Sequence, residues 1–91
     1  MQTTPKLQIA VLDRGFVYVG TCSVADGVLT ITGASCIRRW GTTHGLGQLA
    51  AEGPQKDTKL DPADRVTAPI SALVHLIDCN PKAWTNKAAA A

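Results

Sequence analysis

The stretch FVYVGTCSVADGVLTIT, residues 16–32, decides the fold that this sequence predicts. Its first part is β-branched and aromatic, a composition that suits a half-buried pleated surface. Asp26-Gly27 follows between hydrophobic residues, and such a pair is the strongest short-range signal for a β-hairpin. We therefore expect strands over residues 16–22 and 28–32, joined by a tight turn.

Further strands are expected on both sides of this hairpin. Residues 7–13 have the alternation of a strand that Asp13-Arg14-Gly15 ends, and another strand is expected over residues 35–39. Residues 55–64 are polar and contain Asp61-Pro62, which predicts a loop. A strand interrupted by proline follows over residues 65–69, so it should be an edge strand or a strand end. A tight turn at residues 70–73 then leads into a last strand, residues 74–77.

A short helix is expected over residues 45–52. Leu46, Leu49 and Ala50 have the i, i+3, i+4 spacing of one helix face, and Gly53-Pro54 is a typical helix end. Thr42 or Thr43 could cap its N-terminus, where free N–H groups favour anions. Near the end of the chain, Asn80 should cap one helical turn that starts at Pro81.

This order of elements predicts a mainly β fold, a small SH3-like or Sm-like β-barrel with one short helical insertion. Residues 1–84 are expected to form one domain and residues 85–91 a flexible C-terminal tail. The chain is 45% hydrophobic but only 4% aromatic, so its core is small and aliphatic. Such a core gives little stabilisation, which favours a homo-oligomer. Trp84 is expected to close the bottom of the barrel or to anchor an interface.

Composition excludes several classes of protein. The net charge of +2 is too small for a general nucleic-acid coat. Three cysteines without a C-x-x-C spacing predict neither a disulfide framework nor a zinc ribbon, and no metal or cofactor is expected. The polar N-terminus and the absence of a long apolar run predict a protein of the cytoplasm, without a signal peptide or a membrane contact.

The run IRRWGTTHGLG, residues 37–47, carries the candidate site. Guanidinium groups bind phosphate oxygens bidentately, an indole stacks on a base, and glycines let backbone N–H groups approach an anion. These are the means of binding an anionic, nucleotide-like ligand. The candidate ligand-binding residues are Arg38, Arg39, Trp40, Gly41, Thr42, Thr43, His44 and Gly45.

Purely structural interpretations of the same residues stay open. Successive strand residues point to opposite faces, so both arginines grip one phosphate only if the strand has ended or a second subunit contributes. One arginine could instead lie on the surface while the other pairs with one of the acids Glu52, Asp57, Asp61 and Asp64. Trp40 could be a packing residue, a threonine a helix cap and His44 a solvated side chain. His75, in the last strand, is expected to be half-buried.

The chain resembles a family of small bacteriophage and prophage proteins that share an I-R-R-W-G-T-T-x-G-L-G motif. The resemblance rests on this motif, on Arg14-Gly15-Phe16-Val17 and on Ala83-Trp84, and it extends over residues 7–84. It implies a phage setting, in the cytoplasm of the host, and attaches no activity. By analogy, some small phage proteins are oligomeric sponges that sequester nucleotide signals of bacterial immunity.

Three functions are therefore compared. The first is non-catalytic binding of an anionic nucleotide-type ligand, of which a sponge that counters host defence is the most concrete version. The second is an Sm-like module for single-stranded RNA or DNA, which the small net charge disfavours. The third is a structural or adaptor protein that binds a host or virion protein. Because the sequence contains no G-x-S-x-G, no H-E-x-x-H and no Walker loop, no enzymatic activity is expected.

Overall fold

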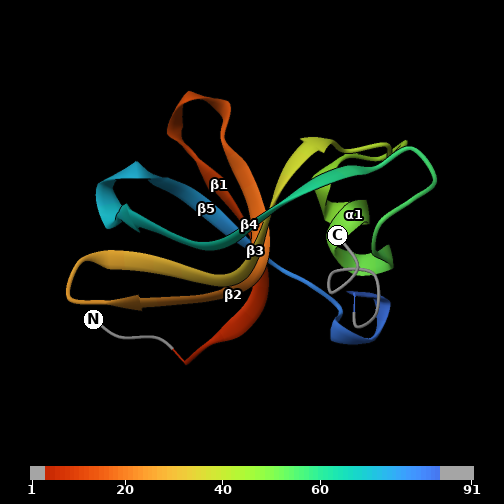
Figure 1. Cartoon of the computed structure of the whole chain (residues 1–91). Coiled ribbons are helices and arrows are strands. Elements are labelled where there is room, and N and C mark those ends of the chain that lie inside the picture. The colour runs from red at the N-terminus through yellow and green to blue at the C-terminus, as the bar shows by residue number, and fades with distance from the viewer. Residues whose placement is uncertain (1–3, 85–91) are drawn as a thin grey trace.

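A computed structural model describes residues 4–84, which form one five-stranded antiparallel sheet with short helices (Figure 1). The strands lie side by side in the order β4-β3-β2-β1-β5, and this open sheet is consistent with a small barrel-like fold. The predicted mainly β, barrel-like class is confirmed. In chain order the elements are β1 (Lys6–Leu12), η1 (Asp13–Gly15), β2 (Val17–Ala25), β3 (Val28–Arg39), α1 (Leu46–Glu52), β4 (Lys59–Pro69), η2 (Ile70–Ala72) and β5 (Leu73–Asp78). The tail expected at residues 85–91 lies outside the described residues.

The β2–β3 hairpin forms at the predicted turn. Ala25 lies opposite Val28, and the two residues between them, Asp26 and Gly27, have φ angles of 51° and 77°. Positive φ at both central residues gives the turn the twist of the strands that it joins. The turn predicted between β4 and β5 is also confirmed, as the 3₁₀ helix η2.

Two strand predictions were wrong in their extent. The strands expected at 28–32 and 35–39 are one continuous strand, β3. Gly33, with φ of 58°, lies where the pairing with β4 shifts register, so the strand bends instead of ending. The loop expected over 55–64 ends early, because β4 begins at Lys59 and includes Pro62. Proline is tolerated there because β4 is an edge strand, as the sequence predicted for its second half.

The helix prediction is confirmed in extent but wrong at its N-terminus. Helix α1 ends at Gly53, whose N–H donates to the Leu49 carbonyl at 2.9 Å. It begins after Gly45, which has φ of 85° and provides no side-chain cap, so neither Thr42 nor Thr43 is the capping residue. The helical turn at residues 81–84 is present, and the Lys82 N–H donates to Asn80 Oδ1 at 3.2 Å.

Both faces of the sheet carry a hydrophobic cluster, because successive strand residues point to opposite faces. Helix α1 and the C-terminal turn cover one face, and in Figure 1 both lie on the same side of the sheet. The cluster beneath them consists of Ile9, Val17, Val19, Ile37, Leu49, Ala50, Cys79 and Trp84. The cluster on the other face, inside the curled strands, consists of Ala10, Leu12, Cys22, Val24, Leu29, Ile31 and Ala34.

Trp84 is the largest fully buried side chain among the described residues, so it belongs to the core of the single chain. Its indole Nε1 donates to the Ala50 carbonyl at 3.0 Å, and the same carbonyl accepts the Asn80 N–H at 2.9 Å. The C-terminal turn is thereby attached to α1. His75, in contrast, is exposed on β5, so the expectation of a half-buried histidine was wrong.

Candidate functional site

The two arginines of the motif lie at the end of β3 and have different surroundings. Arg38 Nη1 donates to Asp61 Oδ2 at 2.8 Å, and both side chains are largely exposed. One arginine therefore pairs with an acid, as the structural interpretation of the motif allowed. The pairing with β4 shifts register between Ile37 and Arg39, so the simple alternation of side chains is interrupted there.

Arg39 lies beside a second cation and an exposed indole. Its partner across the β3–β4 ladder is Lys59, and both side chains are exposed. Among the described residues neither has an ion-pair partner. Trp40 follows directly and is 43% exposed, so it is no core residue. We call Arg39, Trp40 and Lys59 the basic–aromatic surface. Sequence reasoning missed Lys59, because only the strand register brings it opposite Arg39.

The loop after β3 holds Trp40 in place by contacts to the segment before β4. The Trp40 carbonyl accepts the hydroxyl of Thr58 at 2.6 Å. Gly41 follows with φ of 69°, and a Cβ there would collide with the backbone of Asp57 and Thr58. Glycine is thus required at this point of the motif by a close backbone approach rather than by a ligand.

The polar groups of the next residues are used within the loop. Gln48 Oε1 accepts the N–H groups of Thr43 (3.1 Å) and His44 (2.7 Å) and also the Thr43 hydroxyl (3.2 Å). The Thr42 hydroxyl donates to the Gly45 carbonyl at 2.9 Å. The Thr43 and His44 amides are therefore occupied by Gln48, and α1 has only seven residues. The exposed imidazole of His44 makes no hydrogen bond to another described residue.

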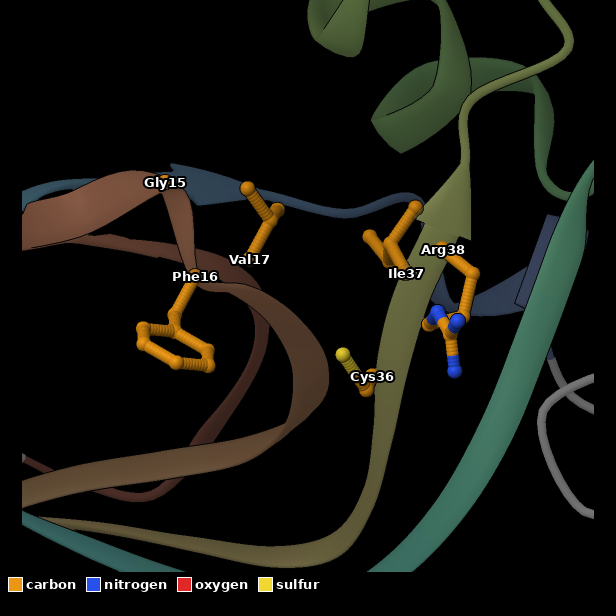
Figure 2. Close-up of a pocket in the computed structure, with 6 residues that line it drawn as sticks. All are labelled: Gly15, Phe16, Val17, Cys36, Ile37 and Arg38. Atoms are coloured by element: carbon orange, nitrogen blue, oxygen red, sulfur yellow. The ribbon is translucent and has the colours of Figure 1, made fainter.

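A hollow of about 370 Å³ opens between β2 and β3 beside the motif (Figure 2). The two strands pair as far as Tyr18 opposite Cys36 and then separate. Beyond that point β2 continues against β1, and β3 continues against β4. We call this hollow the notch; it is lined by Gly15, Phe16, Val17, Cys36, Ile37 and Arg38. No local pattern placed the first four of these residues in a site, since the notch forms where two distant segments separate.

The cysteines differ in their access to solvent. Burial raises the pKa of the Cys22 thiol to about 11. Burial, followed by the influence of Cys22 and Asp78, raises the pKa of the Cys79 thiol to about 12. Cys36 is less buried than either, and its sulfur lies in the notch (Figure 2). In the described part of the chain, Cys36 is the least buried cysteine and therefore the one most accessible to reagents. The two buried thiols are in addition poor nucleophiles, because their pKa values are raised.

Within residues 4–84, no group of three or more histidine, cysteine or acidic side chains is arranged to hold a metal ion. No helix in that range is long and apolar enough to cross a membrane. Comparison of the chain with protein-family models and with curated proteins finds no match.

Proposed function

We propose that the protein is a binding module, without catalysis, for an anionic nucleotide-type ligand, and that the basic–aromatic surface contacts it. The observation that carries the proposal is the pairing of Arg39 with Lys59 beside the exposed Trp40. Like charges directly opposite each other in a sheet are destabilising. An anion between them would relieve this repulsion, and the indole beside them offers a face on which a base stacks.

The other residues of the motif support the surface rather than add donors to it. Thr58 and Gly41 set the path of the chain after Trp40, and Gln48 orders the loop that follows. In this proposal Arg38 has a separate role, because Asp61 already accepts from its guanidinium. His44 remains available to donate to a phosphate or a ribose.

A single chain leaves the basic–aromatic surface open. Arg39 and Trp40 line neither the notch nor the smaller hollow at Thr4, Lys6, Gln8 and Leu76. A second copy of the chain would enclose a ligand on this surface, so the proposal includes a homo-oligomer. Sequestration of a nucleotide signal, which the resemblance to phage proteins suggests, is a function that needs enclosure and no reaction.

Binding of the four ribonucleoside triphosphates, measured by native mass spectrometry and by titration, tests the proposal. Removing the stacking partner by Trp40→Ala should weaken binding about ten- to a hundredfold. Arg39→Gln and Lys59→Gln should each weaken it about tenfold or more, because each removes a charge-assisted contact. Arg65→Gln is the matched control: it removes the same charge six residues further along β4 and should leave affinity within twofold.

The outcomes separate the three functions. A triphosphate that is bound to an oligomer and recovered intact on denaturation supports sequestration. Tight binding of a twelve-nucleotide single strand instead, with affinity falling steeply with salt, would favour the nucleic-acid module. If neither probe binds, or if Arg65→Gln weakens binding as much as Arg39→Gln does, the nucleotide proposal is wrong.

A further inference from the structure

The notch combines three chemical groups on the walls of one hollow. The Phe16 ring is 52% exposed and stacks on Tyr18, with the ring centroids 6.5 Å apart and the planes 7° from parallel. Arg38 lines the hollow from β3, where its side chain extends toward Asp61 on β4, and the Cys36 sulfur points from the same strand toward the Phe16 side (Figure 2). Residues with an aromatic ring, a cation and a thiol thus line one hollow, which lies where β2 separates from β3, with the cation at its β4 side.

The walls are otherwise apolar. Val17 and Ile37 belong to the hydrophobic cluster beneath α1, and each contributes to the lining from its own strand. The volume of about 370 Å³ lies near the lower end of the range of about 300–1,000 Å³ for small-ligand pockets. A single or fused planar ring is of a size that suits such a space.

The charge of the notch comes from Arg38. Asp61 accepts from one of its terminal nitrogens, Nη1, at 2.8 Å. A guanidinium carries five N–H donors in a planar fork, so donors remain for an anion in the notch. Both partners of this ion pair are more than half exposed, so solvent screens the competition from the carboxylate.

We propose that the notch is a binding site for a small planar aromatic ring that carries an anionic substituent. The ring lies against Phe16 and the apolar walls, and the anion binds the guanidinium of Arg38. This site goes beyond the proposed nucleotide function. It shares no residue with the basic–aromatic surface, and its test uses other probes and other variants, so either proposal can fail without the other.

Cys36 allows occupancy of the notch to be measured directly. Its thiolate attacks a sulfur of an aromatic disulfide; the reagent's S–S bond breaks, a mixed disulfide forms on Cys36, and the aryl thiolate leaves. We choose 5,5′-dithiobis(2-nitrobenzoate), whose ring carries a carboxylate, 2,2′-dithiodipyridine, which is aromatic and neutral, and cystamine, which is aliphatic and cationic. Cys36→Ser gives the background from the two buried thiols, which react slowly because burial raises their pKa.

Each wall of the notch has its own variant. Arg38→Gln should slow the reaction with the anionic aromatic reagent about tenfold and leave that with the neutral one within twofold. Phe16→Leu should slow both aromatic reagents severalfold and leave cystamine unchanged, because it removes the ring but keeps an apolar side chain. Arg39→Gln is the matched control, since it removes the neighbouring charge without altering the lining, and it should change each rate less than twofold.

Reversible binding is tested with the unreactive analogue 4-nitrobenzoate. It should protect Cys36 in a saturable way, and cyclohexanecarboxylate, which has the charge but no aromatic ring, should protect at least tenfold less well. Equal effects of Arg38→Gln and Arg39→Gln would show that local potential alone drives the reaction. The proposal is wrong if those two variants have equal effects, if the two carboxylates protect equally well, or if Cys36 reacts with none of the three reagents.

Discussion

Replacement of Trp84 should destabilise the protein more than replacement of Trp40, although both are tryptophans in a chain with little other aromatic content. Trp84 is fully buried, whereas Trp40 is 43% exposed. Truncating a buried tryptophan to alanine costs about 3–5 kcal/mol. A domain of this length has a free energy of unfolding of about 5–14 kcal/mol, so Trp84→Ala should remove a large part of it.

Trp84→Phe divides this loss into its components. It keeps a ring in the core but removes the Nε1 hydrogen bond to the Ala50 carbonyl. That carbonyl still accepts the Asn80 N–H at 2.9 Å, so no buried acceptor is left without a partner. The lost hydrogen bond and the smaller ring together should cost about 1–2 kcal/mol.

Urea unfolding gives the differences in free energy and thermal unfolding gives those in melting temperature, both followed by far-UV circular dichroism. Trp84→Ala should lower the melting temperature by at least about 12 °C, since about 1 kcal/mol corresponds to about 4–8 °C in a domain of this size. Trp40→Phe, the surface control, should change the free energy of unfolding by less than about 0.5 kcal/mol. If Trp84→Ala were within 0.5 kcal/mol of the unaltered protein, the C-terminal turn would contribute nothing to the core, and the reasoning would be refuted.

Two further predictions concern the loop and the charged surface. Gly41→Ala should destabilise by more than about 2 kcal/mol, because φ is 69° and a Cβ would meet the backbone of Thr58; Gly47→Ala, in open space on α1, should stabilise slightly in the same urea assay. The hydrogen bond from Gln8 and, after it, a lysine ion pair hold the pKa of Asp78 below its ordinary value. Because the folded-state pKa is the lower one, the stabilisation is present above the unfolded-state pKa of about 4 and is lost as pH falls through the folded-state value. Urea midpoints of Asp78→Asn and of the unaltered protein should therefore differ at pH 7 and converge at low pH, and a gap that persists there would contradict this.

The local elements of the fold could be predicted from the sequence because their causes are local. The Asp26-Gly27 turn needs only two residues that tolerate positive φ, and both have it. Gly53, where α1 ends, likewise has a positive φ of 80°. The strand at Lys59–Asp64 was missed because its polar residues and Pro62 have the composition of a loop. Pairing with β3 determines its conformation there, and that pairing joins residues distant in the chain.

For the candidate site, composition indicated the motif, whereas the exposure of Trp40 and the surroundings of the motif depend on tertiary structure. The sequence alone determined that guanidinium, indole and imidazole groups occur together in residues 37–47, because their order is covalent. Only the β3–β4 register decided that Arg39 faces Lys59 while Arg38 binds Asp61. Only the separation of β2 from β3 decided that Phe16 and Cys36 share a hollow with Arg38. Contacts between distant segments follow from strand pairing and packing, which the local pattern of residues does not specify.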